Sequence, residues 1–370
     1  MYRLLVFGMT ENAGGVESCI MNYYRHVDKD KIQFDFLCNT HKQVAYEEEL
    51  KRLGGRCYHI TARSENFRKY NCELEQVFSE HSNEWDAIWV NVCSLANIDY
   101  LKKAKKYGLK RCIIHSHNSQ NMDGKLRILL HYWNRKNIKK LATDFWACSE
   151  EAADWFYQGE ERENVVVIHN AIDLEKMKFD KKKRENIRKS YDLGNKYVIG
   201  NIGRLHFQKN QSFAIDVFTE FHKNNKDSVL ILVGQGEDEE FLKEKVKENN
   251  LEDAVIFTGI QKDIQAWLSA FDLFLFPSLF EGLSIAALEA QANGVPVLAA
   301  DKVIPEDIRI NDNFVFYDLK NGEAEWCKKV EKMKNVSRAM PISIKSGFIE
   351  AGFDIKNEVK NFERLVLNGK

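Results

Sequence analysis

The sequence has no apolar run that approaches the roughly 20 residues of a membrane-spanning helix. The apolar run within MYRLLVFGMT, at the start, is too short for a secretory signal peptide. The 8 cysteines never form a C-x-x-C pair and occur mostly inside apolar runs, which indicates buried thiols in a reducing compartment. We therefore expect a cytoplasmic protein.

A low-complexity tract and a short-period repeat are also absent, and neither sign of charge is in excess. The 54 Lys and Arg residues balance 55 Asp and Glu residues, for a formal net charge of −1, and no recognised nucleic-acid-binding module is evident. We therefore expect no nucleic-acid partner. The 370 residues, 44% of them apolar, suffice for two domains that each bury a core.

Strand-like and helix-like segments alternate along the chain, which predicts parallel, doubly wound sheets and an α/β fold. In the first part, apolar runs predict strands at residues 3–7, 34–38, 57–60, 87–90, 111–114, 143–148 and 165–168. In the second part, they predict strands at residues 197–202, 229–233, 254–257, 273–276 and 295–299. We place an N-terminal domain at residues 1–172, a second domain at 173–350 and a C-terminal amphipathic helix at 351–370.

Two features of the first domain predict contacts with a ligand. Gly14 and Gly15 open a helix after the first strand, so backbone N–H groups can approach a phosphate or a sugar without an intervening side chain. A plain turn is the alternative. The polar cluster HSHN at 115–118 follows the strand at 111–114, at the edge where parallel sheets bind ligands, and we favour His117 as the functional residue. We reject a metal site, because no nearby Cys or carboxylate completes the ligand set.

Residues 125–140 combine Lys and Arg with leucines, Tyr132 and Trp133, within a longer stretch in which basic residues far outnumber acidic ones. A basic, aromatic and amphipathic helix can lie in the interface of an anionic membrane. That interpretation adds a peripheral contact with the inner face of the cell membrane. The alternative is a helix that packs its apolar stripe on the sheet and exposes its charges.

The loop after the first strand of the second domain predicts an anion site. Arg204 and Lys209 follow the strand at 197–202 and precede a helix, so their cations can converge on a diphosphate. Gly234 and Gly259 follow the next two strands. The G-x-G that begins at Gly234 lacks the third glycine and the downstream acid of a dinucleotide site, so it does not favour NAD.

The segment from Phe271 to Asp301 reads as strand, loop, helix and strand. Pro277 ends the strand, and Ser284 can cap a helix that opens directly after Glu281. The N-terminus of that helix favours an anion such as a phosphate. On a continuous helix, Glu281 and Glu289 would lie roughly 12 Å apart along the axis and about 80° apart around it. Two such carboxylates can bracket an elongated ligand with sugar, phosphate and ribose parts, such as a nucleotide sugar.

This segment strongly resembles the family 4 retaining glycosyltransferases of the GT-B fold. Their pattern of two glutamates with seven residues between them, a small-residue helix and a G-x-P turn is matched by Glu281, Glu289, Gly294 and Pro296. The family's other motifs occur in the family's order: the GG loop, H-S-H-N, N-x-I-D at 170–173 with Ala171 in place of the usual glycine, and G-R-L-x-x-x-K at 203–209. The version EAQA-x-G-x-P is similar to that of bacterial capsule and exopolysaccharide enzymes.

The resemblance implies two Rossmann-like, doubly wound domains that face each other across a cleft, with a C-terminal helix that crosses back to the first domain. It also implies retaining transfer of a hexosyl group from a nucleotide sugar, expected to be a UDP-sugar, to a glycan or lipid-linked acceptor. No metal or other cofactor is expected. The alternatives are a nucleotide-sugar epimerase of the same architecture and a non-catalytic nucleotide-sugar-binding protein.

The resemblance also assigns roles to residues. Arg204 and Lys209 would stabilise the leaving diphosphate, Glu281 would hold sugar hydroxyls, and Glu289 would hold the ribose. His117 would position the sugar and the acceptor. Together, the residues expected to contact the donor are Gly14, Gly15, Gly203, Arg204, Lys209, Gly234, Gly259, Glu281, Gly282, Leu283, Ser284 and Glu289.

Overall fold

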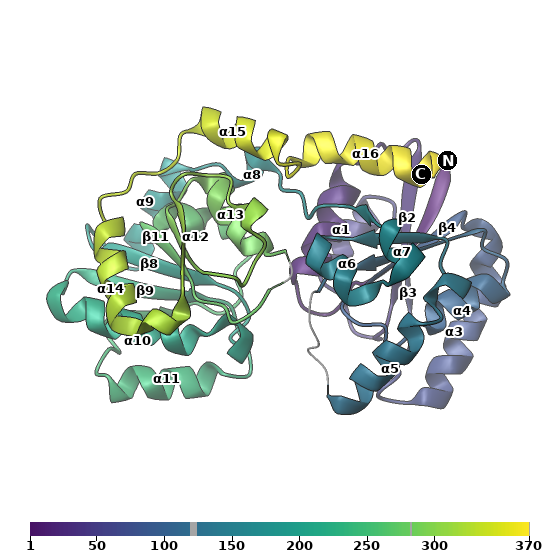
Figure 1. Cartoon of the computed structure of the whole chain (residues 1–370), viewed down its shortest axis with the longest axis horizontal. Coiled ribbons are helices and arrows are strands. Elements are labelled where there is room, and N and C mark those ends of the chain that lie inside the picture. The colour runs from purple at the N-terminus through teal and green to yellow at the C-terminus, as the bar shows by residue number, and fades with distance from the viewer. Residues whose placement is uncertain (119–123, 282, 370) are drawn as a thin grey trace. The chain divides into compact units, whose positions relative to one another are not determined.

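The computed structural model describes residues 1–118, 124–281 and 283–369, and the chain divides into two compact α/β units (Figure 1). The first unit comprises Met1–Ala171 and Ile355–Lys370, and the second comprises Ile172–Asp354. Each unit is built on one wholly parallel sheet whose strands are connected mainly through helices, as the alternating pattern predicts.

The sheet of the first unit has seven strands in the order β3-β2-β1-β4-β5-β6-β7. Its strands are β1 (Tyr2–Phe7), β2 (Ile32–Cys38), β3 (Cys57–His59), β4 (Ala87–Val92), β5 (Arg111–Ser116), β6 (Asp144–Ala147) and β7 (Val166–Val167). The helices of this unit are α1 (Gly15–His26), α2 (Glu47–Arg52), α3 (Phe67–His81), α4 (Asp99–Lys106), α5 (Lys125–Arg135), α6 (Glu150–Phe156), α7 (Gly159–Glu163) and α16 (Ile355–Asn368).

Every strand predicted in the first 172 residues is present, but the prediction for β5 is too short. The strand continues through His115 and Ser116, because both residues pair with β4 on one side and with β6 on the other. His115 therefore lies inside the sheet rather than in a loop beyond it. Neighbouring strands decide this extension, and their pairing is not encoded in the local run of residues.

The C-terminal helix α16 is part of the first unit, although almost two hundred residues separate it in sequence from the rest of that unit. Its Phe362 ring lies 4.6 Å from the Tyr23 ring and 5.0 Å from the Trp89 ring, measured between centroids. The Asp28 backbone N–H donates to Glu363 at 2.7 Å. The helix thus covers the apolar face of α1 and completes the core of this unit.

The sheet of the second unit has six strands in the order β10-β9-β8-β11-β12-β13. Its strands are β8 (Tyr197–Ile202), β9 (Ser228–Val233), β10 (Val255–Phe257), β11 (Leu273–Phe276), β12 (Val297–Ala300) and β13 (Phe314–Tyr317). The helices are α8 (Leu174–Met177), α9 (Lys181–Ser190), α10 (Gln211–Asn224), α11 (Glu239–Glu248), α12 (Ile264–Ala270), α13 (Ile285–Asn293), α14 (Gly322–Met333) and α15 (Pro341–Glu350). The edge strand β13 was not predicted from the sequence.

The cysteines follow the expectation of burial only in part. Cys19, Cys38, Cys112 and Cys148 are buried thiols, whereas Cys72 and Cys93 are exposed, so the expectation is wrong for these two. An apolar neighbourhood in the sequence does not decide which face of a helix or loop a residue occupies. None of the described helices is long and apolar enough to cross a membrane.

Candidate functional site

The strand order of the second unit brings two loops together at the carboxyl edge of its sheet. The order reverses between β8 and β11, and such a reversal is where open parallel sheets bind ligands. The loops after these strands are joined by hydrogen bonds: the Leu279 N–H donates to the Gln208 carbonyl at 2.8 Å, and the Gln208 amide donates to the Phe280 carbonyl at 2.9 Å. The loop with Lys209 and the loop with Glu281 therefore form one surface.

Lys209 and Glu281 form an ion pair at this edge, with 2.6 Å between Nζ and Oε1. Their side chains are only 18% and 7% exposed, so the pair is largely desolvated. Gly203 lies under the aliphatic part of Lys209, since a Cβ at Gly203 would come within 3.2 Å of the lysine Cε. The resemblance assigns these two charges to different parts of one ligand, and the structure places them in direct contact.

Arg204 is held by a different carboxylate. Its side chain is 68% exposed, and its Nε lies 2.9 Å from Oε2 of Glu237 on the loop after β9. A hydrogen bond from its own backbone N–H, together with the charge of Arg204, lowers the pKa of Glu237, so this side chain is ionised at neutral pH. Convergence of Arg204 and Lys209 on one diphosphate stays a prediction, because each cation is paired with a separate glutamate here.

Helix α13 begins directly after the predicted cap, Ser284, and not directly after Glu281, where the sequence analysis places its start. Ser284 is the N-cap and accepts a hydrogen bond from the Ala287 N–H at 3.4 Å. Because the first helical residue is Ile285, Glu281 lies outside the helix, and the spacing calculated for two glutamates on one continuous helix is wrong. Gly282 lies outside the described residues, and Leu283 is buried.

Glu289 lies within α13 and is half-buried by surface area. Protein atoms that surround the carboxyl group desolvate it and raise its pKa to about 7. Among the described residues, no hydrogen bond or ion pair of this carboxylate is found. Such a group is poised to change its charge near neutral pH and to accept hydrogen bonds from a ligand once it is ionised.

Gly234 and Gly259 shape the same edge through their backbones. The Gly234 N–H donates to the Gly259 carbonyl at 3.0 Å. Gly234 has a φ of +139°, and a Cβ there would lie 2.0 Å from the Gly203 carbonyl oxygen. The G-x-G that did not favour NAD therefore has a packing role, because it lets the loop after β9 approach the backbone of the Arg204 loop closely.

His117 lies at the carboxyl end of β5 in the first unit and is almost fully buried. Its Nε2 lies 2.8 Å from Oδ1 of Asn91, whose amide nitrogen donates to the Phe7 carbonyl at 3.2 Å. This orientation of Asn91 assigns the proton to Nε2 of His117. The other nitrogen, Nδ1, is buried and has no hydrogen-bond partner within the described part of the chain.

Burial keeps both histidines of this cluster neutral. The His115 and His117 rings lie 4.1 Å apart between centroids, and desolvation lowers the pKa of His117 to about 3 and that of His115 far below its usual value. The unpaired Nδ1 of His117 is therefore a lone-pair acceptor at neutral pH. It suits a hydroxyl donor on a ligand better than an anion.

The GG loop of the first unit contains a residue that the sequence interpretation missed. The Gly14 N–H donates to Oε2 of Glu17 at 3.0 Å, and the Thr10 hydroxyl donates to Oε1 at 2.5 Å. Glu17 is buried, and burial raises its pKa. The N–H of Gly14 that was expected to approach a ligand is thus occupied by Glu17, while Gly15 is exposed. The capping-box spacing from Gly14 to Glu17 was the available signal.

Both halves of the sequence match known glycosyltransferase families. Residues 13–176 match the family described as Glycosyltransferase Family 4, and residues 183–335 match the one described as Glycosyl transferases group 1. The chain belongs to the glycosyltransferases of this two-domain type. The two matched segments fall within the first and the second unit, apart from a few residues at the junction.

This glycosyltransferase is similar to bacterial glycosyltransferases. It is 28% identical over 358 residues to the putative glycosyltransferase EpsF of Bacillus subtilis, across 94% of this chain and 92% of that one. It is 36% identical over 141 residues to the UDP-Gal:alpha-D-GlcNAc-diphosphoundecaprenol alpha-1,3-galactosyltransferase of Escherichia coli, across 37% of this chain and 36% of that one.

The fold is shared with Anabaena HepE. The crystal structure of HepE in complex with UDP-glucose aligns with 98% of this chain and 99% of that one, with a TM-score of 0.79 and 19% sequence identity. At this identity the likeness shows the fold, which is GT-B with two Rossmann-like domains, as the sequence motifs imply.

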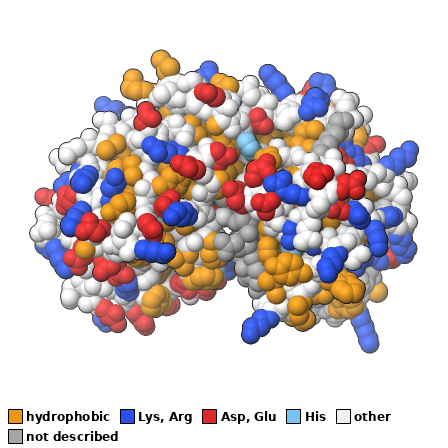
Figure 2. All heavy atoms as spheres, in the orientation of Figure 1, with side chains coloured by type: hydrophobic (Ala, Val, Ile, Leu, Met, Phe, Trp, Pro, Cys, Tyr) orange, Lys and Arg blue, Asp and Glu red, His pale blue; other side chains and the backbone are white. Residues whose placement is uncertain are grey.

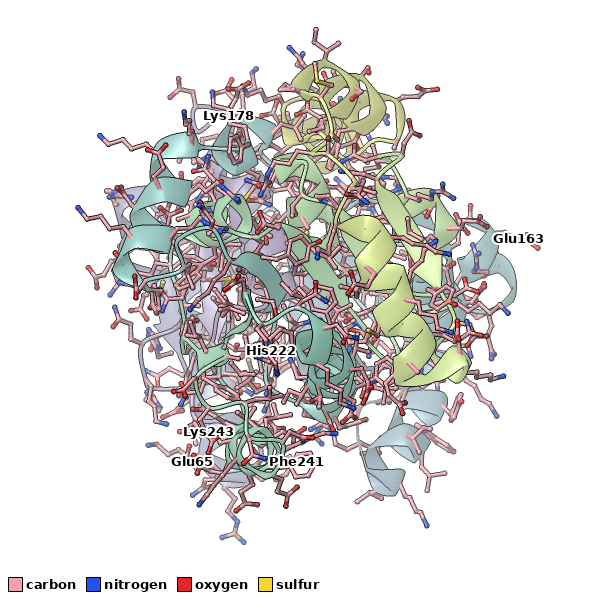
Figure 3. All side chains as sticks on the ribbon, turned by 90° about the vertical axis from the view of Figure 1, so that its left-hand side faces the viewer. Glu65, Glu163, Lys178, His222, Phe241 and Lys243 are labelled. Atoms are coloured by element: carbon pink, nitrogen blue, oxygen red, sulfur yellow. The ribbon has the colours of Figure 1, made fainter. Side chains whose placement is uncertain are left out.

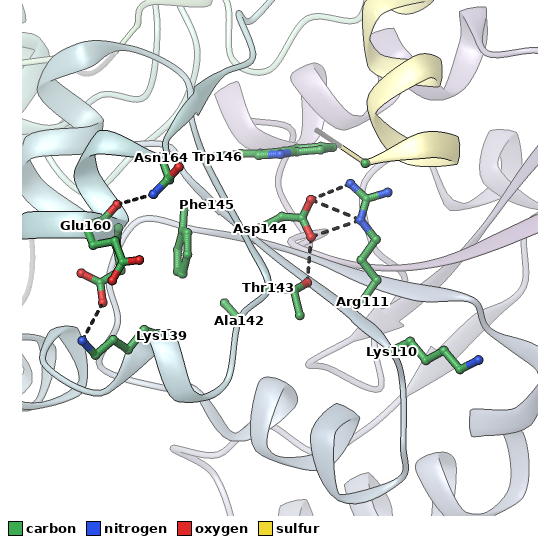
Figure 4. Close-up of a pocket in the computed structure, with 12 residues that line it drawn as sticks. Lys110, Arg111, Lys139, Ala142, Thr143, Asp144, Phe145, Trp146, Glu160 and Asn164 are labelled. Carbon is green, nitrogen blue, oxygen red and sulfur yellow. Dashed lines mark hydrogen bonds and ion pairs between the residues drawn. The ribbon is translucent and has the colours of Figure 1, made fainter.

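The glycosyltransferase also has a pocket of about 760 Å³ at the opposite edge of the first sheet (Figure 4). Figure 4 shows two of its cations in ion pairs: Arg111 lies 2.6 Å from Asp144, and Lys139 lies 3.8 Å from Glu161. None of the predicted site residues lines it. Because this edge carries the amino ends of β5 and β6, away from the polar loops, we assign it no part in the reaction.

Among the described residues, no three or more His, Cys, Asp or Glu side chains lie in the arrangement of a metal site.

Proposed function

We propose that this glycosyltransferase transfers a hexosyl group from a UDP-sugar to a glycan or lipid-linked acceptor in the synthesis of a bacterial surface polysaccharide, with retention at the anomeric carbon. The printed names of its relatives support the class of donor and acceptor: the E. coli relative uses UDP-Gal and a diphosphoundecaprenol-linked acceptor, and HepE was crystallised with UDP-glucose. The amylovoran biosynthesis glycosyltransferase AmsD of Erwinia amylovora, to which the chain is 28% identical over 153 residues, supports the link to polysaccharide synthesis.

The observation that carries this proposal is the desolvated Lys209–Glu281 pair at the reversal point of the second sheet. A diphosphate that leaves from the sugar gains negative charge in the transition state, and a lysine ammonium at this edge of the sheet can stabilise that charge. Glu281 would accept hydrogen bonds from sugar hydroxyls while Lys209 turns to the phosphates. Arg204 would add a second cation, so that protein cations supply the charge that a metal ion supplies in other transferases.

Two further residues have roles in this proposal. Glu289, once ionised, would accept hydrogen bonds from the two ribose hydroxyls, since vicinal hydroxyls suit the two oxygens of a carboxylate. His117 would accept a hydroxyl hydrogen bond at Nδ1, which has no partner among the described residues, and so position the transferred sugar or the acceptor. This role requires no proton transfer, which is consistent with the low pKa of the ring.

The test measures transfer from UDP-glucose, UDP-galactose and UDP-N-acetylglucosamine to a polyprenyl-diphosphate sugar, with the anomeric configuration of the product read by NMR. Arg204→Ala and Lys209→Ala should each lower turnover on the order of a hundredfold. Lys243→Ala, on the exposed face of α11 (Figure 3), should leave turnover unchanged. Full turnover in both site variants, an inverted product, or isomerisation of the donor without acceptor would contradict the proposal.

Helix α5 supports a contact of this enzyme with a membrane. Leu126 and Trp133 are 72% and 71% exposed, and Leu129 and Tyr132 are exposed as well. Figure 2 shows hydrophobic side chains beside Lys and Arg side chains in this part of the first unit. The alternative that the helix packs its apolar stripe on the sheet is therefore wrong. Polar anchors hold α5 instead: the Leu95 N–H donates to His131 at 3.0 Å.

We propose that these apolar side chains enter the interface of an anionic membrane, with the neighbouring lysines close to the headgroups. Leu126→Ser combined with Trp133→Ser should abolish sedimentation with anionic vesicles and leave thermal stability unchanged, because both side chains are already exposed. Phe241→Ser, at an exposed aromatic residue of α11 (Figure 3), is the matched control and should leave sedimentation unchanged. Equal sedimentation of the double variant and the wild type would contradict a membrane role for α5.

A further inference from the structure

Glu237 lies between two side chains of the Arg204 loop. Its Oε2 is 2.9 Å from Nε of Arg204, and its Oε1 is 3.4 Å from Nε2 of His206. The other ring nitrogen of His206, Nδ1, accepts a hydrogen bond from the Gln208 N–H at 3.4 Å, which assigns the proton to Nε2. The carboxylate of Glu237 therefore lies between the two side chains, with one oxygen near Arg204 and the other near His206.

Backbone hydrogen bonds hold together the two loops that carry Arg204 and Glu237. The Gly203 N–H donates to the Val233 carbonyl at 3.0 Å, and the Leu205 N–H donates to the Gln235 carbonyl at 3.2 Å. Gly236 packs so closely that a Cβ there would lie 2.1 Å from the Leu205 carbonyl oxygen. The loop after β8 and the loop after β9 therefore behave as one body, and Glu237 has a fixed position relative to the backbone of Arg204.

The ion pair with Glu237 occupies only one of the three guanidinium nitrogens of Arg204. Glu237 accepts from Nε of Arg204, and within the described residues the two terminal nitrogens have no hydrogen-bond partner. An arginine side chain that is 68% exposed would otherwise sample several rotamers, each with its terminal nitrogens in a different direction. A carboxylate on Nε restricts these rotamers and leaves the terminal N–H groups for an anion.

We propose that Glu237 is a positioning residue that holds the guanidinium of Arg204 so that its two terminal nitrogens face the diphosphate of the donor. The inference rests on the proposed function, in which Arg204 stabilises the leaving diphosphate. His206 orients Glu237 from the other side. Glu237 is half-exposed, and Arg204 already offsets its negative charge. Replacement of Glu237 should therefore change turnover more than donor affinity.

The test is a double-mutant cycle on turnover and on the Michaelis constant for the UDP-sugar. Glu237→Ala should lower kcat about tenfold with little change in KM, since a misplaced catalytic group loses rate without losing ground-state binding. Glu237→Gln keeps an oxygen acceptor for Nε and should recover most of that loss. In the Arg204→Ala background, Glu237→Ala should cause no further loss.

The control is Glu240→Ala, which removes an exposed carboxylate from the adjacent helix α11 and should leave kcat unchanged. If Arg204→Ala lowers kcat while Glu237→Ala and Glu237→Gln do not, the inference is overturned and the proposed function stands. Additive losses from Glu237→Ala and Arg204→Ala would overturn it too, as would tighter donor binding in Glu237→Ala. Full turnover in Arg204→Ala would overturn the assignment of Arg204 and, with it, the inference.

Discussion

Replacement of Lys209 by methionine removes the cation that lies 2.6 Å from Glu281 and retains most of the lysine's apolar length. Loss of one partner from a fully buried ion pair destabilises a protein by roughly 3–5 kcal/mol, whereas exposed pairs contribute at most about 1 kcal/mol. Lys209 retains 18% of its exposure and Glu281 retains 7%, so we expect a loss of about 2–3 kcal/mol. For a domain of this size, that loss lowers the melting temperature by roughly 4–12 °C.

Calorimetric unfolding of Lys209→Met, of Glu281→Gln and of the double variant measures this effect. The double variant should be more stable than Lys209→Met by about 1 kcal/mol or more, because it leaves no buried carboxylate beside a missing cation. Lys243→Met serves as the control, since Lys243 pairs with Glu239 at 2.8 Å on an exposed helix and should contribute little to stability. The reasoning is refuted if Lys209→Met unfolds no earlier than Lys243→Met.

Three further predictions concern pH and backbone packing. Because the raised pKa of Glu289, about 7, leaves roughly one-tenth of the carboxyl ionised at pH 6 and nine-tenths at pH 8, UDP-glucose should bind about tenfold more tightly at pH 8. Calorimetric titration should find this dependence in the wild type and a flat profile in Glu289→Gln. The lowered pKa values of His115 and His117 mean that the unfolded chain binds more protons below about pH 6.5, so stability should fall as pH drops from 6.5 towards 3. Urea unfolding at pH 7.5, 6 and 5 should show this loss, and equal stability at the three values would contradict it. Gly234→Ala should destabilise by more than about 2 kcal/mol in the same assay, because the new Cβ meets a carbonyl at 2.0 Å, whereas Gly15→Ala, with nothing within 4 Å, should be nearly neutral.

Several elements of the fold were determined by the sequence alone. Strands β8 and β11 begin and end at the predicted residues, since a run buried on both faces and closed by a loop is a local signal. Ser284 caps α13, and Gly294 ends it with a φ of +79°, because both signals depend on the backbone of a few neighbouring residues. The α/β class follows from the alternation of such segments.

Other elements depended on neighbours that the sequence does not identify. The extension of β5 through His115 depends on pairing with β4 and β6, and the short edge strand β13 depends on pairing with β12. In each case a local pattern allowed more than one structure, and a distant segment selected one.

The chemistry of the candidate site was the part that only the tertiary structure decided. The residue types at 204, 209, 281 and 289 could be named from their motifs, but their partners could not. Lys209 meets Glu281 across 72 positions of sequence, and Arg204 meets Glu237 across 33, because the strand order places their loops side by side. The low pKa of His117 and the exposure of Trp133 on α5 likewise depend on surrounding atoms from other segments. Sequence determines which groups a chain carries and its local backbone preferences, whereas desolvation and pairing arise only when the sheet brings distant loops to one edge.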